Sequence, residues 1–158
     1  AVGGNTQTQY PGAAEYGGDK GIFYGGTNGS RYNLSHLVSN VGVIGSDVAG
    51  VGTARSALAG CDYGGNKAIM AYGTTGSLTN VSNLISNAGV VATDTAGVGT
   101  NRSAVGACEY GGKKGIFGFG TTGSASGITN LVSDTGVIAS DVAATGAVRG
   151  AVMACSYG

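Results

Sequence analysis

A 47-residue period runs through the whole chain and constrains its fold more than any other feature. The stretch YGGDKGIFYGG at 16–26 returns as YGGNKAIMAYG at 63–73 and as YGGKKGIFGFG at 110–120, without an insertion or a deletion. Periods between about 20 and 50 residues are typical of solenoids, propellers and other repeat arrays. We therefore divide the chain into an N-terminal strand or arm at 1–15 and a repeat region at 16–158, with the units 16–62, 63–109 and 110–156.

Each unit contains four short segments rich in β-branched or small residues. One complete set lies at 54–63, 66–73, 78–86 and 90–96, so its first segment begins just before the unit 63–109. Glycine-rich turns separate the four segments. Such closely spaced turn signals are typical of antiparallel all-β folds. The pair Asn28-Gly29 predicts a tight hairpin, because both residues tolerate positive φ. The sequence therefore predicts an all-β protein with four strands per unit.

Four strands in a unit of this length match the size of one β-propeller blade. The small residues of the segment 54–63 suit an innermost strand, which must crowd around a narrow central channel. The units resemble Kelch-like blades: an arginine opens the inner strand, an apolar second strand follows a glycine turn, and Gly25-Gly26 supplies a Gly-Gly pair once. The Trp usual in the fourth Kelch strand is missing.

A second resemblance concerns the phrases KGIF and TNLVS with their glycine-rich flanks. These are similar to repeats in bacteriophage tail and virion proteins. That resemblance implies a virion or extracellular location and a scaffold without catalytic residues, and it brings no cofactor or metal ligands with it.

Three blades leave two apolar faces open, and propellers commonly close with four to eight blades. We therefore expect a homodimer that completes six blades around a two-fold axis. The segment 147–157 is a fourth copy of the inner strand, and we expect it to exchange into the first blade of the partner. Residues 6–16 would then pair at an edge or run outward as an arm.

Composition excludes several other partners. The chain has 8 basic and 8 acidic residues and a net charge of zero, which argues against nucleic acid as a partner. No apolar run is long enough to insert into a membrane as a helix. Glycine is abundant, but apolar residues recur in fixed positions, so the pattern is unlike that of a disordered chain.

Two repeated charges form the first candidate site. Arg55, Arg102 and Arg149 share one repeat position, and Asp47, Asp94 and Asp141 share another, eight residues upstream. They are interpreted as Asp–Arg pairs that tie blades together, or alternatively as a ring of cations that accepts an anion or a sugar. Variable tyrosines near the hairpin add Tyr24, Tyr32 and Tyr72, with Arg31, to the candidate ligand-binding residues.

Other repeated residues carry less chemistry. Cys61, Cys108 and Cys155 share a position that suits a small buried residue. Glu15, Asp62 and Glu109 would lie beside the channel but on different blades, which disfavours a metal site. His36 is the only histidine and is expected to serve as a surface or hydrogen-bonding residue.

These observations favour a non-enzymatic structural or interaction module, in a phage particle or surface appendage, with itself and other virion proteins as partners. The alternative is a lectin-like propeller that binds surface glycans at one shallow site per blade. A hydrolase with its site in the channel is a weaker third possibility, because clustered carboxylates or histidines are missing from the pattern.

Overall fold

The computed structural model describes residues 9–156, and the nine strands in this range form three three-stranded antiparallel sheets. The prediction of an all-β fold is confirmed, since none of the described residues is helical. In each sheet the strand order follows the chain. Sheet 1 contains β1 (Gly12–Tyr16), β2 (Lys20–Tyr24) and β3 (Ser35–Val38); sheet 2 contains β4 (Ala59–Tyr63), β5 (Lys67–Ala71) and β6 (Ser82–Ile85); sheet 3 contains β7 (Gly106–Tyr110), β8 (Lys114–Gly118) and β9 (Thr129–Val132).

The repeated YGG phrase makes the tight turn between the first two strands of each sheet. In sheet 1, Tyr16 pairs with Lys20, and the turn between them uses Gly17 and Gly18 at φ of 68° and 81°. Only glycine adopts such angles without strain. The predicted hairpin at Asn28-Gly29 is also present: Thr27 bridges Arg31, and Gly29 has a φ of 111°.

The fourth predicted strand of each unit does not form, so the prediction of four-stranded sheets is wrong in this respect. The segment 43–49 touches β3 through two isolated bridges, Val38 to Ile44 and Ser35 to Val48. The two bridges are three residues apart on β3 but four residues apart on the segment 43–49. The extra residue makes a β-bulge that interrupts the ladder. The same two bridges recur beside β6 and β9.

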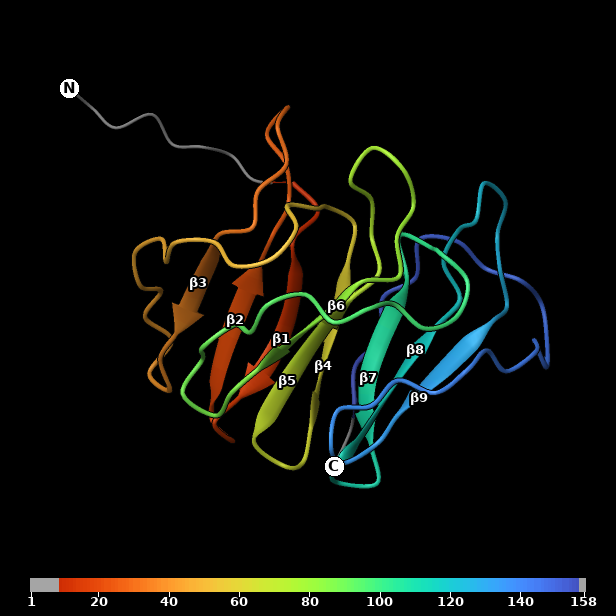
Figure 1. Ribbon diagram of the computed structural model, residues 1–158. Helices are drawn as coiled ribbons and strands as arrows, with labels where there is room; N and C mark the ends of the chain where they lie inside the picture. Colours follow the sequence, from red (N-terminus) through yellow and green to blue (C-terminus); the bar gives the residue numbers. More distant parts are fainter. Residues whose placement is uncertain (1–8, 157–158) are drawn as a thin grey trace.

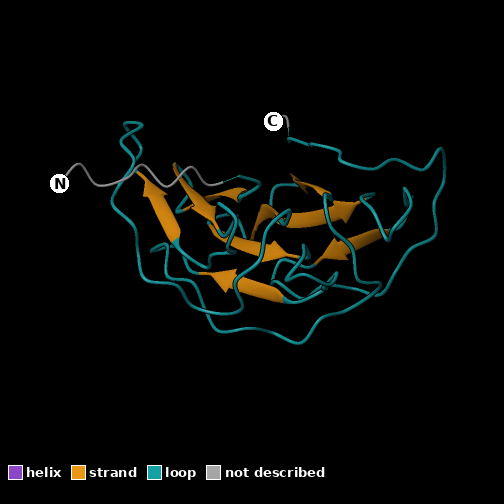
Figure 2. Cartoon of the chain, turned by 90° about the horizontal axis from the view of Figure 1, so that it is seen from above, coloured by secondary structure: helices purple, strands orange, loops and turns teal. Residues whose placement is uncertain are grey.

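The three sheets stand side by side in chain order, with sheet 2 between the other two (Figures 1 and 2). Strand β1 lies beside β4, and β4 lies beside β7. The hydrophobic core is divided into two clusters, one between sheets 1 and 2 and one between sheets 2 and 3. We call these two packed regions the first and second joints.

Equivalent residues differ in burial according to their place along the chain. Phe23 is 40% exposed, whereas Met70 and Phe117 at the same repeat position are fully buried. Tyr16 and Tyr63 are 4% exposed, whereas their equivalent Tyr110 is 39% exposed. Each sheet thus has an N-side face, which packs on the preceding sheet, and a C-side face, which packs on the following one. Among residues 9–156, sheet 1 has no neighbour on its N-side face, and sheet 3 has no full sheet on its C-side face.

The terminal segment, residues 147–156, covers part of the C-side face of sheet 3. Ser126 bridges Arg149, and a Cβ placed on Gly106 would lie 3.0 Å from Val152 Cγ2. At the first joint a Cβ placed on Gly12 would meet Leu58 Cγ at the same 3.0 Å. The terminal segment therefore occupies the position of a following inner strand, although it forms no strand among the described residues.

The N-terminal boundary differs from the sequence-based division. Strand β1 (Gly12–Tyr16) crosses the limit drawn between 15 and 16 and is the inner strand of sheet 1. Of the two expected states, residues 12–16 take the first: they form an edge strand of sheet 1 and do not run outward as an arm. The part of the predicted arm at 1–8 lies outside the described residues.

Candidate functional site

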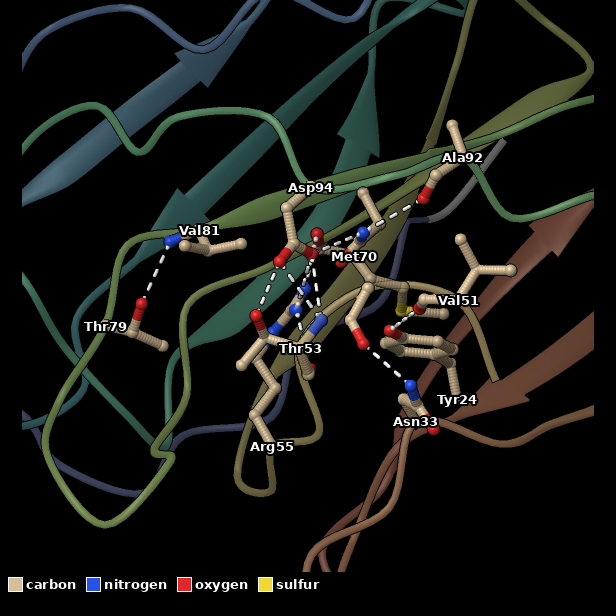
Figure 3. Close-up of polar contacts among 12 residues, drawn as sticks. Tyr24, Asn33, Val51, Thr53, Arg55, Met70, Thr79, Val81, Ala92 and Asp94 are labelled. Atoms are coloured by element: carbon tan, nitrogen blue, oxygen red, sulfur yellow. Dashed lines mark hydrogen bonds and ion pairs between the residues drawn. The ribbon is translucent and has the colours of Figure 1, made fainter. Parts of the chain in front are cut away.

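Arg55 is the central residue of the first joint (Figure 3). Its backbone belongs to the edge of sheet 1, because Gly26 N–H donates to its carbonyl at 2.8 Å and its own N–H donates to the Tyr32 carbonyl at 3.2 Å. Its guanidinium is directed at sheet 2, where Nε donates to the carbonyl of Tyr72 at 3.1 Å. The side chain is fully buried, and Nη2 also donates to the Met70 carbonyl at 3.3 Å. Arg55 therefore connects two sheets.

Asp94 forms an ion pair with Arg55 and accepts hydrogen bonds from Thr53, in the linker just before Arg55. Arg55 Nη1 lies 3.9 Å from Asp94 Oδ1. The Thr53 hydroxyl donates to Asp94 Oδ2 at 2.5 Å, and the Thr53 N–H donates to Oδ1 at 3.0 Å. Asn83 Nδ2 also donates to Oδ1, at 2.9 Å. Although partial burial acts in the opposite direction, these hydrogen bonds and the charge of Arg55 lower the pKa of Asp94.

The expected Asp–Arg pair that ties two units together is thus present at the first joint. Arg55 pairs with Asp94, which lies 39 residues downstream, and not with Asp47, which lies eight residues upstream. Asp47 and Arg55 both belong to the part of the chain that borders sheet 1, so they do not face each other across the first joint. The carboxylate that meets the arginine comes from the outer edge of the following sheet.

An aromatic ring lies under the guanidinium of Arg55 at the first joint and under that of Arg102 at the second. The Arg55 guanidinium carbon is 5.6 Å from the centre of the Tyr24 ring, and the Arg102 carbon is 4.7 Å from that of Tyr72. The two tyrosines are not at the same repeat position, because Tyr72 aligns with Gly25. Their hydroxyls nevertheless reach equivalent carbonyls: Tyr24 donates to Val51 at 2.7 Å and Tyr72 to Val98 at 3.4 Å. Burial raises the pKa of Tyr72 to about 12, and this effect exceeds the opposing charge of Arg102.

The second joint has the same residues in equivalent places, but its arginine makes different hydrogen bonds. Arg102 is fully buried, and its Nη2 donates to Asn130 Oδ1. Asn130 Nδ2 in turn donates to Asp141 Oδ1 at 2.9 Å, and Asp141 holds the Thr100 hydroxyl at 2.6 Å. The asparagine therefore relays the arginine to the carboxylate. Arg102 Nε and Nη1 have no acceptor among the described residues.

The two ends of the repeat hold unmatched halves of this arrangement. Arg149 lies over the ring of Phe119 at 5.7 Å, but it is exposed and makes no ion pair within residues 9–156. Asp47 is exposed at the outer edge of sheet 1, where it pairs with Nε2 of His36. His36 thus forms a side-chain contact at the position of Asn83 and Asn130, as expected for a hydrogen-bonding residue.

The seven candidate ligand-binding residues are divided between the joints and the surface. Four of them, Tyr24, Tyr72, Arg55 and Arg102, are buried between sheets. Arg31 is exposed near the tip of the first hairpin, Tyr32 is half-buried, and Arg149 is exposed on the terminal segment. The structure thus brings Tyr24 together with Arg55 and Tyr72 together with Arg102, while the surface residues form no common group with them.

The small and acidic residues of the inner strands line an open pocket of about 420 Å³. Its wall comes from β1, β2, β4, β7, the end of β3 and the terminal segment, and it includes Glu15, Asp62 and Glu109. Burial, and then the charges of Glu109 and Glu15, raise the pKa of Asp62. No three His, Cys, Asp or Glu side chains within residues 9–156 are grouped closely enough to hold a metal ion. Cys61 is buried, Cys108 half-buried and Cys155 exposed, so the expected burial holds only at the first position.

Sequence reasoning missed the threonine and asparagine partners of the carboxylates. Thr53 and Thr100 share one repeat position, and Asn83 and Asn130 share another. A search for polar residues repeated at the period would have found both pairs. Their partnership crosses a joint, however, and a repeat alignment alone does not reveal which sheets face each other.

The comparisons with known proteins add no family. No protein-family model matches the chain, and no curated protein is significantly similar to it. Among residues 9–156 no helix has the length and apolar character needed to cross a membrane.

Proposed function

We propose that the chain is a non-enzymatic structural or interaction module whose three sheets act as blades of a β-propeller that is completed by further copies of the chain. The observation that carries this proposal is the change in burial along the repeat. Met70 and Phe117 are fully buried, but Phe23 at their position is 40% exposed. A position that is apolar in every unit and buried wherever a neighbour is present is built to receive a neighbour.

The two open faces are apolar and different from one another. The N-side face of sheet 1 exposes Phe23 and Ile44, and the C-side face of sheet 3 exposes Tyr110 and Leu131. Complete burial of a large apolar side chain contributes about 1.5–3 kcal/mol, and exposed apolar patches of this kind commonly mark interaction sites. Because the faces differ, copies would join head to tail. Such contacts form a closed ring when the rotation allows it and a filament when it does not.

The internal joints supply a template for the missing contact. A Cβ on Gly89 would lie 3.0 Å from the ring of Tyr16, and one on Gly136 would lie 2.9 Å from the ring of Tyr63. The equivalent Gly42 has nothing within 4 Å of that point in the part of the chain that the structure describes. Tyr110 is the matching tyrosine at the other end of the chain. Its ring would pack on Gly42 of the next copy, and two copies would then form a ring of six blades.

The scaffold is favoured over the lectin-like alternative by the position of the tyrosines and arginines. A shallow sugar site on each blade requires accessible rings and donors. Tyr24, Tyr72, Arg55 and Arg102 instead contact residues of neighbouring sheets. A phage particle or surface appendage, with other virion proteins as further partners, is the setting that we propose for the assembly.

Sedimentation equilibrium on the purified chain tests the proposal. The expected mass is twice that of the 15.2 kDa chain, with dissociation only on dilution. A folded protein that stays at 15.2 kDa at every concentration would refute it. A glycan array on the same sample tests the alternative, since binding that is lost on substitution of Arg31 and Tyr32 would support a lectin.

A further inference from the structure

We propose that Arg149 of one copy pairs with Asp47 of a second copy, and that the terminal segment of the first copy replaces residues 9–16 as the inner strand of sheet 1 in the second. This inference rests on the proposed assembly and specifies its polar contact. It is carried by the two internal joints, which show what each unmatched residue contacts when its neighbour is present.

The backbone of Arg149 is already in the position that its equivalents occupy. Gly120 N–H donates to the Arg149 carbonyl at 3.0 Å, and Arg149 N–H donates to the Ser126 carbonyl at 3.2 Å. At the second joint, Gly73 N–H donates to the Arg102 carbonyl at 2.8 Å, and Arg102 N–H donates to the Thr79 carbonyl at 3.4 Å. An aromatic ring lies under the guanidinium at both places. The direction in which Arg149 would contact a following sheet is therefore set.

Asp47 is the matching carboxylate. It stands at the position of Asp94, which meets Arg55, and of Asp141, which Asn130 links to Arg102. Its side chain is 62% exposed, and His36 is its only ion-pair partner within residues 9–156. Arg55 and Arg102 come from one repeat position, and the residue at that position before sheet 1 is Thr8. A threonine carries no charge, so it offers Asp47 no ion pair.

The terminal segment also offers a better apolar residue than the segment it would replace. Leu58 and Val105 are each 5% exposed in the two joints, and the equivalent residue of the terminal segment is Val152. The N-terminal equivalent is Pro11, which is exposed and lacks a backbone N–H. Replacement of residues 9–16 by the terminal segment of a second copy would therefore place valine where proline now stands. Ala147 replaces Thr53 and Thr100, so the carboxylate would keep a backbone N–H partner without a hydroxyl.

Two charge reversals test the pair. In Arg149→Asp each junction between identical copies would bring two carboxylates together, and in Asp47→Arg it would bring two guanidinium groups together. We expect each variant to lower the self-association constant at least tenfold, because like charges at an interface are repulsive. An equimolar mixture of the two variants should recover association to within about threefold of the wild type, since every mixed junction then pairs opposite charges. The double variant should recover it as well.

Arg31→Asp is the matched control, because Arg31 is exposed and lies outside the pair. It should leave the association constant unchanged, and circular dichroism should show all variants folded. Wild-type association in both single variants would overturn the pairing, as would a loss that neither the mixture nor the double variant recovers. Recovery in the double variant alone would place the pair within one chain and would also overturn it. A wild-type chain that never associates refutes the proposed function itself, which is a separate outcome.

Discussion

The hydroxyl of Thr53 donates a 2.5 Å hydrogen bond to the carboxylate of Asp94, across 41 residues of sequence. The linker that carries Thr53 leaves sheet 1, and Asp94 lies at the outer edge of sheet 2. The bond therefore attaches the linker that leads into β4 to the outer edge of the same sheet, beside β6. Thr100 and Asp141 form the same bond at 2.6 Å in the second joint.

Substitution of Thr53 by valine keeps the shape of the side chain and removes this donor. Hydrogen bonds to charged groups contribute about 1.5–3 kcal/mol when buried. Because Thr53 is exposed, we expect the free energy of unfolding to fall by only about 1–2 kcal/mol. Urea denaturation followed by circular dichroism measures it. Thr122→Val is the control, since Thr122 is an exposed hairpin residue whose hydroxyl makes no hydrogen bond within residues 9–156. Equal losses in both variants would contradict the role of Thr53.

The carboxylates of the joints predict an acid-labile fold. The pKa values of Asp94 and Asp141 are lowered in the folded chain, because donated hydrogen bonds and nearby arginines outweigh partial burial. A group whose folded pKa lies below its unfolded pKa contributes stability above the unfolded value, and this stability is lost as the pH falls through the folded value. The free energy of unfolding should therefore decline below about pH 4. Asp94→Asn should flatten that decline, and an unchanged pH profile would show that Asp94 is not responsible.

The two joint tyrosines should respond differently to loss of their hydroxyl groups. The Tyr24 hydroxyl donates to Val51 at 2.7 Å, whereas the Tyr72 bond to Val98 is longer, at 3.4 Å. Tyr24→Phe leaves a carbonyl without its donor and should cost about 1 kcal/mol. Tyr72→Phe should cost less, in agreement with the natural Phe119 at that repeat position. Thermal unfolding of the two variants side by side provides the measurement, and the reverse order would contradict the assignment.

Equivalent apolar residues should have different roles at the end and in the middle of the repeat. Met70→Ala removes a fully buried side chain at the first joint and should lower the free energy of unfolding by about 2–5 kcal/mol. Phe23→Ala affects the open N-side face, so it should change the stability of the dissociated chain by less than about 1 kcal/mol. It should instead weaken self-association. Urea denaturation below the dissociation concentration separates the two effects, and similar losses of stability would contradict the distinction.

The sequence predicted the period, the all-β class and the position of three strands in each unit. These follow from local signals, namely glycine turns such as Gly17-Gly18 and short apolar segments such as 67–71. The bulged outer edge was missed because the extra residue is visible only against its partner strand. The repeat predicted Asp–Arg pairs between units but left open which aspartate meets Arg55, because a repeat alignment does not show which sheets face each other. The variation of Tyr24 and Tyr72 between units predicts ligand binding. In the structure the two tyrosines are offset by one repeat position, and their rings fill equivalent places under an arginine in the two joints.

The backbone N–H of Gly111 tests most directly whether the open face of sheet 3 forms a joint. At the internal joints, Gly17 N–H donates to the Asn66 carbonyl and Gly64 N–H to the Lys113 carbonyl, both at 2.8 Å. The repeat assigns the Gly111 N–H to the Asp19 carbonyl of the next copy. Amide hydrogen exchange, followed by NMR at high protein concentration, should show Gly111 protected like Gly64. Rapid exchange at Gly111 alongside slow exchange at Gly64 would contradict the assembly.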